Sequence, residues 1–203
     1  KSREIDTLAD AATPEAIDAP IVLSALDAGV AEGIEEEFAA AGALVVSNAR
    51  NHRLSDDVPL LIPEVNAGHL ALIERQREMR GWQGAIVTDP NCATAVIALA
   101  LAPLHQAFGL TEFWVTTLQA VSGAGHPGVP ALDILGNVIP WIDGEEEKIA
   151  RETRKILGSI DGGMVRPARF GVSAQVTRVP VEHGHTAVIA ARSERRVGIH
   201  FFS

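Results

Sequence analysis

The fold is decided by residues 20–48, which read PIVLSALDAGVAEGIEEEFAAAGALVVSN. Two short apolar runs at 20–26 and 43–48 predict buried parallel strands. The acidic stretch between them has the spacing of an amphipathic helix that ends before Gly42, a residue type favoured just after helices. The apolar positions of this helix pattern are Val30, Ile34 and Phe38. A strand, a helix and a strand at this spacing predict a parallel βαβ unit with a right-handed crossover.

The same patterns continue along the chain and then change. A module of alternating strands and helices gives way near Cys92 to longer strands and two helices. We therefore predict an α/β module over 1–91 and an α+β module over 92–203. The further predicted elements are an extended piece at 60–63, a helix over 69–80 with Leu70, Leu72 and Ile73 inward, strands at 84–88 and 113–119, a helix from Cys92 to about 108, a glycine-rich loop at 122–128, a helix over 145–157, and strands within 168–181 and 187–191.

Composition excludes several classes of protein. The chain has 203 residues, one cysteine and a formal net charge of −9. A single cysteine excludes a disulfide framework and leaves the cytoplasm as the default compartment. The acidic balance argues against a broad nucleic-acid or membrane surface but not against a local anion pocket. No apolar run reaches membrane-spanning length, and residues 1–17 contain no secretory hydrophobic region.

Cys92 is the strongest candidate for chemistry. It follows a predicted buried strand and begins a helix, where free N–H groups and the helix dipole favour a thiolate. His185, at the edge of a loop, could act as the general acid or base for such a nucleophile, and His183 competes with it. Each also fits a plain alternative, because a lone cysteine is often a small buried hydrophobe. The His-x-His spacing lacks a convincing third metal ligand, so we predict no metal site.

Charged groups elsewhere could recognise an anion or an ammonium group. Arg53 and Arg178 suit bidentate contact with carboxylate or phosphate. Glu145 begins a predicted helix and lies three residues before Lys148, so the two share a face. Acidic residues at a helix start also occur simply to complement the dipole. The loop that begins at Ser122 could bring backbone close to a ring or phosphate, or could be a plain turn.

The order of these pieces resembles aspartate-semialdehyde dehydrogenase of the archaeal and fungal branch. The resemblance runs from about residue 21 to residue 189, and its motifs are specific in combination. They are SNA with the following Arg at 47–53, DPNCAT at 89–94, QAVSGAG at 119–125, GEEEK at 144–148, and RVPV with GHT at 178–186. The resemblance implies a partial Rossmann-like NADP-binding module followed by a catalytic and dimerisation module.

The resemblance also implies a reaction. NADP(H) would support reductive dephosphorylation of 4-phospho-L-aspartate to L-aspartate 4-semialdehyde through a cysteine thioester, in lysine, threonine and methionine synthesis. Cys92 would be the nucleophile, His185 the acid/base, and Gln119 would orient the thiol or substrate. The other implied roles are Arg178 for the substrate carboxylate, Glu145 for its ammonium, Arg53 and Lys148 for phosphate, and Ser24, Ser47, Asn48, Ser122, Gly123 and Gly125 for the cofactor. Asn91, with the Cys92 N–H, could hold an oxyanion.

Some features depart from the family pattern. Its opening strand and glycine-rich pyrophosphate turn, and its segment beyond the His185 motif, have no counterpart here, and residues 193–203 match nothing in it. Thr177 and His183 stand where the family commonly has Asn and Asp. We therefore expect a catalytic middle portion that binds NADP poorly by itself. The family further implies a cytoplasmic homodimer or homotetramer.

Four alternatives stay open. A malonyl-CoA reductase would share the thioester chemistry but would need no ammonium ligand, so Glu145 and Arg178 favour the aspartyl substrate. N-acetyl-glutamyl-phosphate reductase has similar mechanics but matches the motifs less well. A cofactor-free Cys–His hydrolase needs only Cys92 and His185. A truncated remnant could serve only as a binding or dimerising scaffold.

Overall fold

The computed structural model describes residue 14 and residues 19–196, which form two compact units. Unit 1 contains the described residues up to Pro90 together with Ser159–Arg166, and unit 2 contains Asn91–Gly158 with the described residues from Pro167 onward. The range 92–203, which the sequence assigns to one domain, thus includes a segment that belongs to unit 1. Most of the N-terminal stretch and of the C-terminal tail discussed above lies outside the described residues.

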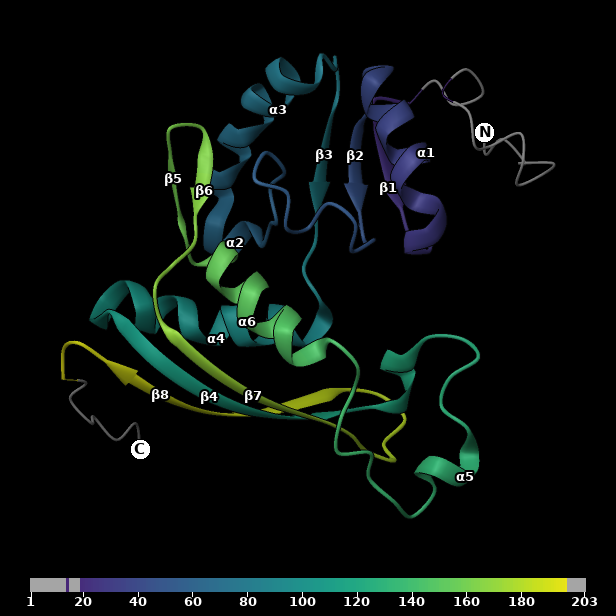
Figure 1. The fold of residues 1–203 in the computed structure, drawn as a ribbon, viewed down its shortest axis with the longest axis vertical. Coiled ribbons are helices and arrows are strands. Elements are labelled where there is room, and N and C mark those ends of the chain that lie inside the picture. Colours follow the sequence, from purple (N-terminus) through teal and green to yellow (C-terminus); the bar gives the residue numbers. More distant parts are fainter. Residues whose placement is uncertain (1–13, 15–18, 197–203) are drawn as a thin grey trace. The chain divides into compact units, whose positions relative to one another are not determined.

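Unit 1 is built on a parallel three-stranded sheet in the order β1-β2-β3 (Figure 1). The segments β1 (Ile21–Ser24), α1 (Ala28–Ala40) and β2 (Leu44–Ser47) confirm the predicted βαβ unit, and β3 (Ala85–Thr88) confirms the third strand. Phe38 of α1 packs with Val45 and Ile86 of the sheet in one apolar cluster. Because the three strands are parallel, their carboxyl ends meet at one edge, where open α/β sheets bind ligands.

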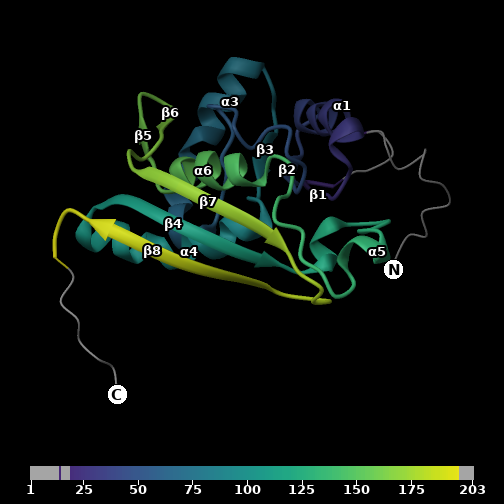
Figure 2. The same ribbon diagram turned by 60° about the horizontal axis from the view of Figure 1, so that its bottom comes forward.

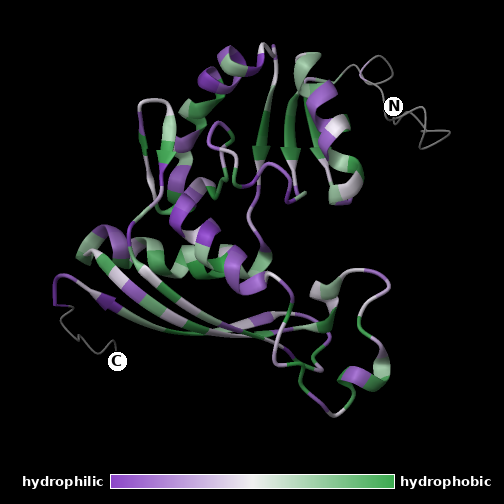
Figure 3. Ribbon diagram, viewed as in Figure 1, coloured by the Kyte–Doolittle hydropathy of each residue, from purple (hydrophilic) through white to green (hydrophobic). Residues whose placement is uncertain are grey.

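The exposed fractions of side chains in β1 and α1 correct two predictions for this unit. The first strand is not buried as predicted, because Ile21 is 57% and Leu23 80% exposed, while Val22 on the other face packs against the core. The helix α1 is also rotated from the predicted stripe, so Val30 is exposed. The buried stripe is instead Ala31, Glu35, Phe38 and Ala39. Figure 3 shows the apolar composition of all three strands.

The segment between β2 and β3 holds three short helical pieces. They are α2 (Pro63–Asn66), η2 (Ala67–Ala71) and α3 (Leu72–Arg80), where one helix over 69–80 was expected. Leu72 is fully buried as predicted, whereas Leu70 is exposed because it lies in the 3-10 turn rather than on the helix. A hairpin of β5 (Ser159–Asp161) and β6 (Met164–Arg166) completes the unit and was not foreseen.

Unit 2 is a sheet in the order β7-β4-β8 with two helices on one face (Figures 1 and 2). The strand β4 (Leu110–Gln119) runs parallel to β7 (Gly171–Arg178) and antiparallel to β8 (His185–Ser193). The helices α4 (Cys92–Phe108) and α6 (Glu145–Ile156) pack on this sheet. The core residues include Ile97, Leu101, Phe113, Val115, Ile149 and Val176.

The second face of this sheet is open. Trp114 and Leu118 of β4 and Val188 of β8 point to that side, with exposures of 41%, 39% and 64%. Between β4 and α6 the chain forms η3 (Val121–Ala124) and α5 (Ala131–Ile134). None of the helices in the described part of the chain is long and apolar enough to cross a membrane.

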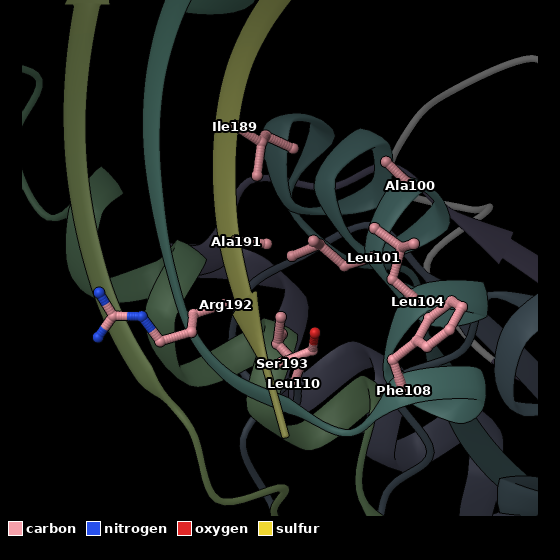
Figure 4. A pocket seen from close by; sticks show the side chains of 9 residues that line it. All are labelled: Ala100, Leu101, Leu104, Phe108, Leu110, Ile189, Ala191, Arg192 and Ser193. Carbon is pink, nitrogen blue, oxygen red and sulfur yellow. The ribbon is translucent and has the colours of Figure 1, made fainter. Parts of the chain in front are cut away.

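A pocket of about 310 Å³ lies between α4 and β8 (Figure 4). Its walls are mainly apolar, with Leu101, Leu104 and Phe108 facing Ile189, and the Arg192 side chain points away from them. Neither Cys92 nor His185 lines it. The candidate chemistry therefore lies elsewhere in unit 2.

Candidate active site

Asn91 fixes the start of α4 and thereby the position of Cys92. The Asn91 side-chain oxygen accepts hydrogen bonds from the N–H groups of Ala93 and Thr94, at 3.0 and 3.3 Å. Asparagine is among the best residues for this N-cap geometry. The backbone N–H of Asn91 donates to the buried Glu152 carboxylate at 2.7 Å. Cys92 is thus the first residue of a helix whose start is fixed by the Asn91 cap and by the hydrogen bond from Asn91 to Glu152.

Cys92 and His185 come together although 93 residues separate them. The sulfur lies 3.3 Å from His185 Nε2, and Cys92 is exposed to solvent. The strand register explains the placement of the ring, because His185 begins β8 directly opposite Gln119, the last residue of β4. His183 is exposed and pairs with its neighbour Glu182. Of the two histidines considered from the sequence, only His185 meets the cysteine.

The thiolate of Cys92 is not favoured as the helix position suggested. Partial burial raises the pKa of the Cys92 thiol, and the Glu145 carboxylate raises it further. The N–H groups of Ala93 and Cys92, together with Arg178, lower the pKa but do not outweigh these two effects. The N–H groups at the helix start therefore stabilise the thiolate as expected. Desolvation and the nearby Glu145 carboxylate outweigh them, so the pKa of the Cys92 thiol is raised overall.

Glu145 is the inward-facing member of the acidic run at the start of α6. It is buried, and its carboxylate accepts from Asn91 Nδ2 at 3.0 Å and from Lys148 Nζ at 2.6 Å. Burial pushes the pKa of Glu145 upward, but the hydrogen bonds and charge of Lys148, with Asn91 and Gln119, lower it overall. Glu147 instead pairs with Arg151 at the surface. The choice of Glu145 from its offset to Lys148 agrees with this arrangement.

Two residues assigned from the resemblance make unexpected contacts. Gln119 is buried, its side chain interacts with Glu145, and its Nε2 donates to Thr117 Oγ1 at 3.5 Å. The Asn91 side chain is already engaged with two N–H groups and with Glu145. Glu145 uses only one of the two Nδ2 hydrogens of Asn91, so the second hydrogen and the Cys92 N–H are both candidate donors to an oxyanion.

The glycine-rich loop does approach a flat ring, and the ring is that of His185. A Cβ atom on Gly123 would lie 2.8 Å from His185 Cε1 and 2.9 Å from both His185 Nε2 and Arg178 Nη1. Arg178 is buried and donates from Nη1 to the Ala120 carbonyl at 2.8 Å. Burial lowers the pKa of Arg178, while Glu145 and Cys92 offset part of that effect. Ser122 and Gly125 lie at the exposed surface of the same loop.

The cofactor candidates of unit 1 are held by groups of the protein itself. The hydroxyls of Ser24 and Ser47 both donate to the buried Glu35 carboxylate, at 2.5 and 2.7 Å. One signal for this acid was present in the sequence and was missed: Glu35 lies three residues before Phe38, on the buried stripe of α1. The hydroxyl protons of Ser24 and Ser47 are thus occupied, and their carbonyls accept from the N–H groups of Asn48 and Asp89 at 2.9 and 3.1 Å.

Asn48 and Arg53 of unit 1 form part of a polar cluster at the carboxyl end of β2. The Asn48 amide, oriented to satisfy its neighbours, donates to the Asp89 carboxylate at 3.2 and 3.3 Å. Arg53 is buried and donates from Nη2 to the Asn48 carbonyl at 2.8 Å. Burial raises the pKa of Asp89, and the charge of Arg53 opposes that effect.

The described residues contain no group of three or more His, Cys, Asp or Glu side chains that could hold a metal ion. The polar residues gathered around Cys92 are instead a base, an acid, two cations and two amides. Such a set can bind a zwitterion and activate a thiol for attack on a carbonyl carbon.

Comparisons with known proteins show which family the chain resembles. Two family models match the chain: the NAD binding domain of semialdehyde dehydrogenase over residues 2–73, and the dimerisation domain of semialdehyde dehydrogenase over residues 101–200. An aspartate-semialdehyde dehydrogenase of Archaeoglobus fulgidus is 50% identical over 186 residues, which are 92% of this chain and 54% of that protein. A malonyl CoA reductase (NADP) of Metallosphaera sedula is 39% identical over 173 residues, which are 84% of this chain and 48% of that protein.

A solved structure gives the same result. The aspartate semialdehyde dehydrogenase of Candida albicans with NADP superposes with a TM-score of 0.79 at 42% identity, over 90% of this chain and 53% of that one. The chain spans about half the length of the curated relatives that it matches. Both domain models, the sequence identity and the shared fold lead to one conclusion: the chain belongs to the semialdehyde dehydrogenase family.

Proposed function

We propose that the protein carrying this chain is an aspartate-semialdehyde dehydrogenase, which reduces 4-phospho-L-aspartate to L-aspartate 4-semialdehyde with NADPH in lysine, threonine and methionine synthesis. The observation that carries the proposal is the 3.3 Å contact between the Cys92 sulfur and His185 Nε2. Glu145 and Arg178 act on the same sulfur electrostatically. The relatives at 42–51% identity that bear the name of this enzyme support the choice of substrate.

Cys92 supplies the nucleophile. Its thiolate attacks the acyl carbon of the substrate, a C–S bond forms, and the C–O bond to phosphate breaks, so that inorganic phosphate leaves and a thioester remains on the sulfur. The backbone N–H of Cys92 acts on the sulfur and would donate to the developing oxyanion. After reduction, breaking of the C–S bond releases the aldehyde and returns the thiolate. His185 acts as the general acid or base for the proton on the oxygen bonded to this carbon.

The remaining groups bind the two charged ends of the substrate. Arg178 suits the α-carboxylate because its guanidinium can contact both oxygens. Glu145 suits the ammonium group, and Lys148, which now pairs with Glu145, suits the phosphate. Gln119 holds Glu145 in place. Arg53 of unit 1 keeps its proposed role in phosphate binding on the strength of the sequence motif alone.

The residues present suit an NADP(H) cofactor in part. Unit 1 offers the carboxyl edge of a parallel sheet, with Asn48 exposed there and the backbone of Ser24 and Ser47 beside it. Unit 2 offers exposed backbone at Ser122, Gly123 and Gly125. When bound, the nicotinamide supplies a hydride to the thioester carbon.

We further propose a homodimer formed through unit 2 in a soluble, cytoplasmic protein. The match to a dimerisation domain and the open sheet face with Trp114, Leu118 and Val188 support a dimer. Light scattering of the purified protein tests it, with a twofold mass expected and a monomer contradicting it. A tetramer stays a prediction of the family resemblance.

Hydride transfer tests the proposed function. Because the chain spans about half the length of its relatives, the assay uses a chimera. In this chimera the chain replaces the matching 186 residues of the Archaeoglobus enzyme. We expect phosphate-dependent reduction of NADP with L-aspartate 4-semialdehyde, and loss of that activity in Cys92→Ser. Activity confined to malonyl-CoA, or thiol-dependent hydrolysis without cofactor, would favour the corresponding alternative.

A further inference from the structure

Both ring nitrogens of His185 have partners in unit 2. Nε2 faces the Cys92 sulfur at 3.3 Å, and Nδ1 accepts a hydrogen bond from the backbone N–H of Ala120 at 3.2 Å. A backbone N–H can only donate, so Nδ1 must present a lone pair. In the neutral ring the proton therefore resides on Nε2, which points at the sulfur.

We propose that the Ala120 N–H fixes His185 as its Nε2–H tautomer, so that the nucleophile works as a thiolate hydrogen-bonded by a neutral imidazole and not as a thiolate–imidazolium pair. The inference rests on the proposed function only in naming Cys92 the nucleophile. The tautomer itself follows from two contacts that need neither substrate nor cofactor.

The surroundings of the ring oppose the alternative ion pair. An imidazolium carries a proton on each nitrogen, so its Nδ1–H would face the Ala120 N–H across 3.2 Å with no acceptor between them. Ala120 cannot readily withdraw, because it is fully buried and its carbonyl accepts from Arg178 Nη1. Gly123 lies against the ring and limits its tilt.

The charges that act on the sulfur are known for the described part of unit 2. Glu145 on α6 opposes the thiolate, while Arg178 on β7 and the helix N–H groups of Cys92 and Ala93 favour it. His185 on β8 adds a donor in this arrangement rather than a positive charge. Formation of the thiolate therefore releases the thiol proton to solvent, which reaches the exposed Cys92, because Nε2 already carries a proton.

The same tautomer defines what His185 can do later in the reaction. Its Nε2–H can donate a hydrogen bond to an oxyanion at the acyl carbon without a change of protonation. Full transfer of that proton requires Nδ1 to accept a proton from solvent and the Ala120 contact to break. His185 is thus a hydrogen-bond donor first and a proton donor only after a local rearrangement.

Nitrogen NMR tests the tautomer in the unsubstituted chain. The chain has seven histidines, so ¹⁵N-labelled histidine is used and the His185 signals are assigned by their loss in His185→Gln. We expect the proton on Nε2 and an unprotonated Nδ1 at the pH where Cys92 is a thiolate. A proton on Nδ1, in either the other tautomer or the imidazolium, would overturn the proposal.

A pair of amide variants tests the donor role. Glutamine at 185 can place an N–H near the former Nε2 position, whereas asparagine reaches only the Nδ1 position. Cys92 is the only cysteine, so the pH midpoint of iodoacetamide alkylation reports its ionisation directly. We expect His185→Gln to keep the midpoint and His185→Asn to raise it by about one to two pH units, the value of a hydrogen bond to a charged group.

An equal rise in both variants would mean that the ring acts through its charge, and it would contradict the proposal. Circular dichroism and thermal melting check that both variants fold, and the NMR result stands without either. These measurements involve no hydride transfer. Failure of the proposed reductase activity would leave them unaffected, and their failure would leave the activity assay unaffected.

Discussion

Replacing Gly123 with alanine should separate Cys92 from His185. The new Cβ would lie 2.8 Å from His185 Cε1, whereas carbon atoms make favourable contacts at about 3.5–4.0 Å. The ring or the loop must therefore retreat by about 0.7–1.2 Å. We expect the ring to move rather than the loop, which would lengthen the present 3.3 Å separation between Sγ and Nε2 to about 4.0–4.5 Å, the outer limit of a hydrogen bond to sulfur and beyond. Loss of a hydrogen bond to a charged sulfur is worth about 1.5–3 kcal/mol, or about one to two pH units in the Cys92 titration.

The assay is the pH dependence of iodoacetamide alkylation in the whole chain. We expect Gly123→Ala to move the midpoint upward, because the thiolate loses a donor and the neutral thiol does not. Gly125→Ala is the matched control in the same loop. Its φ of +69° makes the substitution strained, but nothing lies within 4 Å of its Cβ, so it should destabilise the loop without moving the midpoint. An unchanged midpoint in Gly123→Ala, or an equal change in both variants, would refute the reasoning.

Three further substitutions have defined outcomes. Glu145→Gln should lower the alkylation midpoint of Cys92, because the carboxylate that disfavours the thiolate is removed. Glu147→Gln, on the exposed side of the same helix, should leave the midpoint unchanged. A rise in the midpoint of Glu145→Gln would contradict the effect assigned to this carboxylate. Asn91→Ala should reduce the free energy of unfolding in urea by about 1–2 kcal/mol through loss of the N-cap, and Asn91→Ser should recover most of it, so equal losses would argue against capping. Glu35→Ala should cost about 2–4 kcal/mol by the same measurement, since two buried hydroxyls lose their acceptor and a cavity opens, and a cost near zero would show that the network is dispensable.

The periodicity of apolar residues was sufficient to predict the helices and strands that bury one whole face. The βαβ unit, β3, α4 and α6 all follow from apolar spacing and from residues that end or cap helices. The hairpin at 159–166 was not predicted because its strands are only three residues long, too short to show an alternating pattern. Val30 was misplaced because the helical phase depends on which residues the neighbouring strands accept, and that information is tertiary. Leu70 was misplaced because the chain forms a 3-10 turn at 67–71, before the helix begins.

The candidate site, like the fold, has features that the sequence predicts and features that only the structure shows. Motif order predicted Cys92, His185 and Glu145 as site residues. The strand register places His185 opposite Gln119, and its ring meets Cys92 at the start of α4. The sequence could not supply the raised pKa of the Cys92 thiol, because desolvation and the distance to Glu145 exist only in the fold. The Ala120 contact was equally hidden, since every residue except proline has a backbone N–H and no side chain marks the one that meets His185.

Trapping of the acyl enzyme tests the central claim most directly. The Archaeoglobus chimera is incubated with L-aspartate 4-semialdehyde and NADP in the absence of phosphate, and its peptides are then analysed by mass spectrometry. The account predicts an aspartyl thioester on Cys92, formed together with one equivalent of NADPH, and neither product in Cys92→Ser. An acyl group on any other residue, or NADPH formed without modification of Cys92, would contradict it.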